Sequence, residues 1–187
     1  NILPELLLSI SILETINNLP ITNHKKDIQN AIRNNIITII KAETWSWKTT
    51  QIPKYISEIP SYTPINIDVT QPRVIAAIWA WNRISQEKLA ETWDPIYSLW
   101  KRIGYRTGRE VNSSYDSQIS INTDGLQLMR QFVSGKIPDV LMVDEIHWYS
   151  TPTEFLIASI RRQMLRTRKK TMKLILTSAT LDEQILQ

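Results

Sequence analysis

The chain has 187 residues, no cysteine, and 22 basic against 18 acidic side chains, which gives a formal net charge of +4. That length fits one domain with a substantial core, and the small positive charge is compatible with a nucleic-acid partner without indicating one. The missing cysteines exclude disulfides and thiolate metal sites and suit a reducing, cytoplasmic compartment. The apolar run over residues 2–13 contains Pro4 and Glu5, lacks a basic leader and is too short to span a bilayer. We therefore expect neither a signal peptide nor a membrane partner.

Predicted helices and strands alternate along the chain. Residues 1–18 form a helical or partly ordered lead-in, and the domain proper runs over 19–187. Hydrophobic periodicity predicts helices over residues 26–34, 48–56, 74–89, 124–132 and 151–166. Apolar or alternating runs predict strands over residues 36–40, 65–70, 102–109, 118–123, 140–143 and 173–177. This order predicts a three-layer α/β domain with a mostly parallel central sheet, in which the polar segments after the strands bind the ligand.

The segment after the first predicted strand has the layout of a phosphate-binding loop. A short polar loop leads into Lys48 and Thr49 at the start of a helix, as in the pattern G-x-x-x-x-G-K-[ST]. In such loops the backbone N–H groups and the helix N-terminus hold phosphate oxygens. Ala42 occupies the first glycine position, which is a mild change. Trp47 occupies the second, where a left-handed backbone is wanted and an indole would fill the place of the phosphates, so read literally the loop is broken.

The composition suggests a different interpretation of the tryptophans. The chain has only 4 Gly but 7 Trp. Together these residues make up close to the share of about 7% that glycine alone usually takes. The simplest hypothesis is that some or all of the tryptophans are glycines in the organism, because a UGA codon was translated with the wrong table. The alternative is a genuinely decayed or unusual loop.

An acidic pair ends the apolar strand predicted over residues 140–143. Asp144 can hold a magnesium ion, directly or through water, and Glu145 can polarise an attacking water. A nucleoside triphosphatase needs both groups at this place. Solvated acids at a strand end are the alternative interpretation, and Lys48 with Thr49 upstream weighs against it.

From residue 19 to residue 187 these segments resemble the DEAH-box helicases of superfamily 2. The family motif GETGSGKTTQIP is matched at Glu43, Thr44 and Ser46 and again over residues 48–53. Four further motifs follow in the family's order: Thr70-Gln71-Pro72-Arg73, Thr123-Asp124-Gly125, Asp144-Glu145-Ile146-His147 with isoleucine for the usual alanine, and Ser178-Ala179-Thr180. Five motifs in the right order are far more specific than any one of them.

The resemblance also bears on the tryptophans. Trp45 and Trp47 fall on the two glycines of GSGK, and Trp93 and Trp100 fall where glycine suits the segment that ends in Gly104-Tyr105-Arg106. Trp79 and Trp81 stand where small residues are usual on a helix, which is weaker support, and the position of Trp148 leaves both interpretations open.

What the resemblance implies is ATP-driven movement along single-stranded RNA, or less often DNA, with strand separation. The implied nucleotide-binding residues are Glu43, Thr44, Trp45, Ser46, Trp47, Lys48, Thr49 and Thr50. Among them, Lys48 would bind the β- and γ-phosphates of ATP, and Thr49 with Asp144 would hold Mg²⁺. Glu145 would be the general base, and coupling of hydrolysis to movement would involve His147, Ser178, Ala179 and Thr180. Contacts to nucleic-acid phosphates and sugars would come from Arg73, Thr123 and Asp124.

The resemblance further implies a second RecA-like domain that closes over ATP. The chain begins at Asn1 and ends soon after its last motif, so we interpret it as a fragment that alone binds nucleotide weakly and hydrolyses little. Three alternatives stay open. The first is a P-loop nucleoside triphosphatase that does not act on nucleic acid, and the second is a catalytically dead scaffold, which applies if Trp45 and Trp47 are genuine. The third concerns Arg73 alone, which would then be only a solvated helix start.

Overall fold

The computed structural model describes residues 2–43, 46–60, 65–97, 102–114, 117–135, 137–148, 150–166 and 172–180. Its helices are α1 (Ile2–Asn17), α2 (Lys25–Asn34), α3 (Lys48–Ser57), α4 (Val74–Thr92), α5 (Asp124–Ser134) and α6 (Thr151–Arg166). Its strands are β1 (Ile37–Lys41), β2 (Ile67–Gln71), β3 (Ile103–Arg106), β4 (Val111–Asn112), β5 (Ile119–Thr123), β6 (Val140–Val143) and β7 (Lys173–Ser178). Every predicted helix and strand is present, most with ends shifted by one to three residues.

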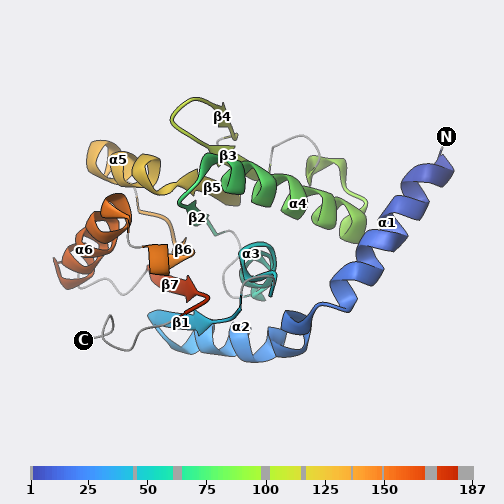
Figure 1. Cartoon of the computed structure of the whole chain (residues 1–187), viewed down its shortest axis with the longest axis horizontal. Helices are drawn as coiled ribbons and strands as arrows, with labels where there is room; N and C mark the ends of the chain where they lie inside the picture. The colour runs from blue at the N-terminus through green and yellow to red at the C-terminus, as the bar shows by residue number, and fades with distance from the viewer. Residues whose placement is uncertain are drawn as a thin grey trace.

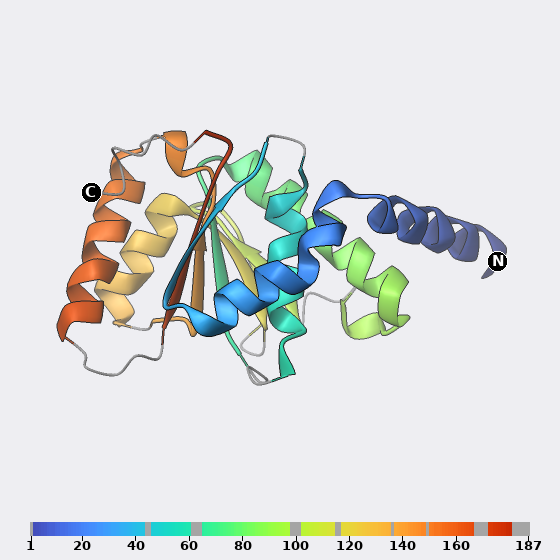
Figure 2. The same ribbon diagram turned by 90° about the horizontal axis from the view of Figure 1, so that it is seen from below.

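The strands form one sheet in the order β1-β7-β6-β2-β5-β3-β4. All neighbouring strands are parallel except β4, which is antiparallel to β3. Figure 2 shows the sheet between α5 and α6 on one side and α2, α3 and α4 on the other. The predicted three-layer α/β fold with a mostly parallel sheet is confirmed. Because the strands are parallel, the segments that follow β1, β2, β6 and β7 meet at the same edge.

One strand was not predicted, and a predicted one is shorter than expected. The strand expected over residues 102–109 ends at Arg106, because the Thr107 N–H donates to the Glu110 carbonyl oxygen at 2.8 Å and closes a turn. That turn leads into the two-residue edge strand β4, whose Val111 side chain is exposed.

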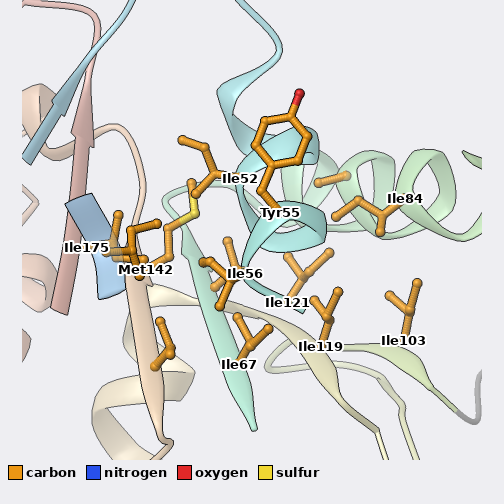
Figure 3. Close-up of a cluster of buried hydrophobic side chains, with 14 of the residues drawn as sticks. Ile52, Tyr55, Ile56, Ile67, Ile84, Ile103, Ile119, Ile121, Met142 and Ile175 are labelled. Carbon is orange, nitrogen blue, oxygen red and sulfur yellow. The ribbon is translucent and has the colours of Figure 1, made fainter. Parts of the chain in front are cut away.

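The core has two parts because successive side chains of a strand point to opposite faces of the sheet. On one face the strands pack against α3 and α4, through side chains such as Ile52, Ile56, Ile84 and Met142 (Figure 3). On the other face Leu141 and Val143 pack against Leu156 and Ile160 of α6. This alternation explains why β6 is an uninterrupted apolar run, since both of its faces are covered.

The lead-in is a helix over nearly its whole length. Helix α1 projects from the body of the domain (Figure 1) and contacts it where Ile12 and Ile16 pack with Ala90 of α4. Within the described ranges, none of the helices is both long and apolar enough to cross a membrane.

Candidate functional site

The loop between β1 and α3 is held at both of its ends. The Ala42 N–H donates to the Ser178 carbonyl oxygen at 3.1 Å, which joins the loop to the end of β7. The Ser46 N–H donates to the Glu43 carbonyl oxygen at 3.1 Å, and the Thr50 hydroxyl donates to the Trp47 carbonyl oxygen at 3.2 Å. Two of the predicted nucleotide-binding residues, Thr44 and Trp45, lie outside the described residues.

Trp47 is the residue before α3 and has a left-handed backbone, with φ of 62°. The left-handed conformation costs a residue with a Cβ atom about 1–2 kcal/mol in conformational free energy, whereas glycine adopts it without this cost. The indole packs on Trp79 of α4, with ring centroids 5.8 Å apart, and the Arg83 guanidinium lies 5.1 Å above it. The ring is therefore packed on α4, and the backbone of this residue has the conformation that the loop motif reserves for glycine.

The first residue of α3 reaches the acidic pair. Lys48 is almost fully buried, and its Nζ lies 2.7 Å from Oε1 of Glu145. The other carboxylate oxygen of Glu145 lies 3.2 Å from Nε2 of His147, and Nδ1 of His147 lies 3.1 Å from the Ser178 hydroxyl. Three segments that are far apart in sequence thus form one continuous line of contacts: Lys48, Glu145, His147, Ser178.

Glu145 itself has a left-handed backbone, with φ of 55°. A non-glycine residue in this region is strained by about 1–3 kcal/mol, and such strain persists only where the surroundings enforce it. Here Lys48 and His147 hold the side chain from two sides. The strained residue therefore lies at the centre of the line of contacts.

Asp144 is held more tightly than any other acid of the site. Its buried carboxylate accepts hydrogen bonds from the Thr49 and Thr177 hydroxyls, from the Gln71 amide at 2.6 Å and from the Glu145 N–H at 2.9 Å. These partners come from α3, β7, β2 and the carboxylate's own loop. The predicted magnesium-binding pair, Thr49 and Asp144, is thus in direct contact, and Gln71 and Thr177 are two fixing residues that were not predicted.

The predicted nucleic-acid residues differ in their surroundings. Arg73 follows β2, is exposed, and its guanidinium lies 4.6 Å above the Trp148 ring. Thr123 ends β5 in register with Gln71 of β2. Asp124, in contrast, is buried, and its Oδ2 accepts hydrogen bonds from the Thr153 hydroxyl at 2.6 Å and the Ser150 hydroxyl at 3.3 Å. Its carboxylate joins α5 to the start of α6.

Ser178 is the last residue of β7, and Ala179 and Thr180 follow it at the same edge of the sheet. Besides meeting His147, the Ser178 hydroxyl lies in hydrogen-bond contact with the Thr180 carbonyl oxygen. The segment therefore contacts both the phosphate-type loop, through the Ser178 carbonyl, and the segment after β6.

The sheet is mostly parallel, and its strand β1 leads through a loop into a helix that opens with a lysine and a threonine. An acidic pair follows β6, which is separated from β1 by β7 alone. Together these features define a P-loop domain of the RecA-like class. No protein-family model matches the chain. Its relatives include the probable ATP-dependent RNA helicase spindle-E of Culex quinquefasciatus, 33% identical over 171 residues, which are 89% of this chain and 12% of the relative. The ATP-dependent RNA helicase HrpA of Escherichia coli (strain K12) is 33% identical over 170 residues, again 89% of this chain and 12% of the relative.

A vertebrate relative, the ATP-dependent RNA helicase TDRD9 of Danio rerio, is 30% identical over 168 residues, which are 88% of this chain and 12% of the relative. The chain is thus homologous to one segment of ATP-dependent RNA helicases, and its resemblance to the DEAH-box helicases is confirmed. It spans about an eighth of the length of the relatives it matches, at 12% in these three.

Proposed function

We propose that this chain is the ATP-binding, first RecA-like part of an RNA helicase that couples ATP hydrolysis to movement along single-stranded RNA. The observation that carries the proposal is the line of contacts from Lys48 through Glu145 and His147 to Ser178. In this proposal Lys48 binds phosphate and Glu145 is the general base. The end of β7 at Ser178 couples hydrolysis to movement of the rest of the protein. The relatives, all named ATP-dependent RNA helicases, support the choice of RNA.

The residues present fit ATP with Mg²⁺. Ser46 has a buried hydroxyl without a hydrogen-bond partner in the described part of the chain, as expected of a group that awaits a ligand oxygen. Thr49 and Asp144 offer one hydroxyl and one carboxylate at a single point, the small set of oxygen ligands that Mg²⁺ takes beside phosphates and water. Bound there, the ion would neutralise charge on the transferred phosphoryl group.

Each side chain of the site has a distinct task in this mechanism. The Lys48 amine would bind the β- and γ-phosphates and, in doing so, leave the Glu145 carboxylate. Glu145 would then be free to accept a proton from the attacking water. His147, which contacts both Glu145 and Ser178, would transmit the change of charge to the segment of Ser178, Ala179 and Thr180.

Arg73 and Thr123 would contact the RNA backbone, since Arg73 follows β2 and Thr123 ends β5 at the edge where ligands bind. Contacts to phosphates and sugars do not depend on the base sequence. Asp124 would lie on the same track; its Oδ2 accepts hydrogen bonds from Ser150 and Thr153, and its buried Oδ1 has no hydrogen-bond partner among the described residues. A second RecA-like domain would close the site, so this chain alone would hydrolyse little ATP.

We infer a cytoplasmic location, because a chain without cysteine suits a reducing compartment.

We also infer that glycine occupies position 47, and with it position 45, in the natural protein. Two of the three non-glycine residues with a left-handed backbone in the described ranges are tryptophans, Trp47 and Trp93. Random placement of tryptophan gives no reason for this coincidence, whereas glycine at both positions explains it. Peptide mass spectrometry of the protein from its source organism tests the inference, and tryptophan at both 45 and 47 would overturn it and favour a dead loop.

The function is tested by measuring ATP hydrolysis of the full-length protein with and without single-stranded RNA, and unwinding of a duplex with a single-stranded overhang. We expect hydrolysis to rise on addition of RNA and unwinding to require ATP. An ATP hydrolysis rate that does not change on addition of nucleic acid would instead favour a nucleoside triphosphatase of another kind. Absence of nucleotide binding would favour the catalytically dead scaffold.

A further inference from the structure

Two of the three most deeply buried charged side chains of the described residues lie between α3 and α4, outside the site; the third is Asp144. Glu87 of α4 has no exposed surface, and Lys54 of α3 is 1% exposed. The Glu87 carboxylate accepts hydrogen bonds from the Lys54 amine at 2.9 Å, the Gln51 amide at 2.7 Å and the Arg83 guanidinium at 2.7 Å. Two of these three donors belong to α3, so one carboxylate of α4 binds the neighbouring helix at two points.

A contribution to stability does not by itself explain a buried cluster of charges such as this one. Removing two charges from water is expensive, and a buried ion pair often contributes no more than well-packed apolar side chains of the same volume. What a buried, fully bonded carboxylate does provide is a fixed direction and distance between the elements that it joins. Apolar contacts between α3 and α4 are less directional.

The cluster lies one turn from the phosphate-type loop. Gln51, which donates its side-chain amide to Glu87, also donates its backbone N–H to the Trp47 carbonyl oxygen at 3.0 Å. Lys48 and Thr49 lie between these two residues, in the first turn of α3. A shift of Gln51 would therefore move the Lys48 amine and the Thr49 hydroxyl together.

We propose that Glu87 is a positioning residue for the nucleotide site: its carboxylate fixes the first turn of α3 against α4 and thereby holds Lys48 and Thr49 where ATP and Mg²⁺ require them. Glu87 does not touch the nucleotide in this proposal. The inference rests on the proposed function, since it assumes that the site binds ATP.

A second acidic residue supplies a matched control. Glu58, directly after α3, forms ion pairs with two lysines. Its carboxylate oxygens lie 2.8 Å from Nζ of Lys88 in α4 and 2.6 Å from Nζ of Lys25 in α2. It also joins α3 to α4, but at the end of α3 that is remote from Lys48. Loss of its charge should disturb the packing of the same two helices without moving the first turn of α3.

The experiment uses the full-length protein with its natural residues at 45 and 47. Affinity for ATP with Mg²⁺ is measured by calorimetry, and KM and kcat are measured at saturating single-stranded RNA, for Glu87→Gln, Glu58→Gln and wild type. Glu87→Gln should weaken ATP binding about 10-fold and raise KM in step, which corresponds to the loss of one hydrogen bond to a charged group. The kcat value should change less than about twofold, and Glu58→Gln should leave affinity and KM unchanged.

A charge swap provides the rescue. The double variant Gln51→Glu with Glu87→Gln keeps one carboxylate and one amide across the same contact, and Lys54, whose Nζ lies 3.4 Å from the Gln51 side-chain oxygen, still faces the carboxylate. We expect it to recover most of the affinity that Glu87→Gln loses. If Glu87→Gln does not fold, the double variant, compared with Gln51→Glu alone, carries the test.

Equal loss of affinity in Glu87→Gln and Glu58→Gln would overturn the inference, as would wild-type affinity in Glu87→Gln with a lower melting temperature. Failure of the swap to restore binding would do so as well. A wild-type protein that binds no ATP is a different result, because it would remove the proposed function and this inference with it.

Discussion

Replacing Trp93 by glycine should stabilise this chain relative to replacing it by alanine. Trp93 ends α4 in the left-handed conformation, with φ of 56°, and its N–H donates to the Leu89 carbonyl oxygen at 2.8 Å. Glycine and alanine remove the same indole, which is 52% exposed, so the lost side-chain contacts cancel when the two variants are compared. What remains is the cost of a Cβ atom in this conformation, about 1–2 kcal/mol, less the extra freedom of glycine in the unfolded chain, about 0.4–1 kcal/mol. We expect Trp93→Gly to exceed Trp93→Ala by about 1 kcal/mol in the free energy of unfolding.

Trp79 provides the control, because it lies inside α4 and is 50% exposed. Glycine in a helix interior is less stable than alanine by about 1 kcal/mol, so the order of the two variants should be reversed there. Urea denaturation followed by far-UV circular dichroism gives the four free energies, and constant m-values confirm that they are comparable. If Trp93→Gly is the less stable of its pair, as at Trp79, the left-handed conformation is not a constraint on this residue and the argument for glycine at 47 loses its support.

Three further outcomes are expected. In the full-length protein with glycine at 45 and 47, Glu145→Gln should retain ATP and Mg²⁺ binding but slow turnover by about 10²–10⁴, since an amide cannot take a proton from water; calorimetry and single-turnover hydrolysis separate the two effects. Lys48→Ala should instead weaken ATP binding itself, and equal binding with equal residual hydrolysis in both variants would mean that the roles are wrongly assigned. Burial raises the pKa of Glu58, but its ion pairs with Lys25 and Lys88 outweigh this and hold that pKa below the ordinary 4.5. The stability that Glu58 contributes is therefore present above pH 4.5 and lost as the pH falls through the lower folded pKa; unfolding experiments should show a smaller acid loss in Glu58→Gln than in wild type.

The fold was predictable wherever the local pattern was strong. Strand β6 was predicted to the residue, because an apolar run covered on both faces stops abruptly at Asp144. Strand β4 was missed because two residues at a sheet edge, one of them the exposed Val111, carry no alternation. Helix α4 runs three residues beyond its predicted end, and a glycine at position 93 would have marked that end correctly.

The candidate site was predictable only in its motif residues. Lys48, Thr49, Asp144 and Glu145 follow a recognisable spacing, which is a property of the sequence. Glu87 carries no such signal, because a glutamate on a helix of mixed polarity normally faces water. Its burial depends on α3, which packs against α4 only in the folded chain, and the same holds for the contacts of Gln71 and Thr177 with Asp144.

The order of the strands also governs when the site can assemble during synthesis. Strand β1, which leads into the phosphate-type loop, lies at the sheet edge, and in the described part of the chain it pairs only with β7. Because β7 is the last of the described strands in chain order, β1 waits for this partner for on the order of ten seconds at ordinary rates of translation. Until then this isoleucine-rich strand has no partner among the described strands, and unpaired strands are prone to aggregate. Binding of a chaperone to the nascent chain would be of most use in this interval.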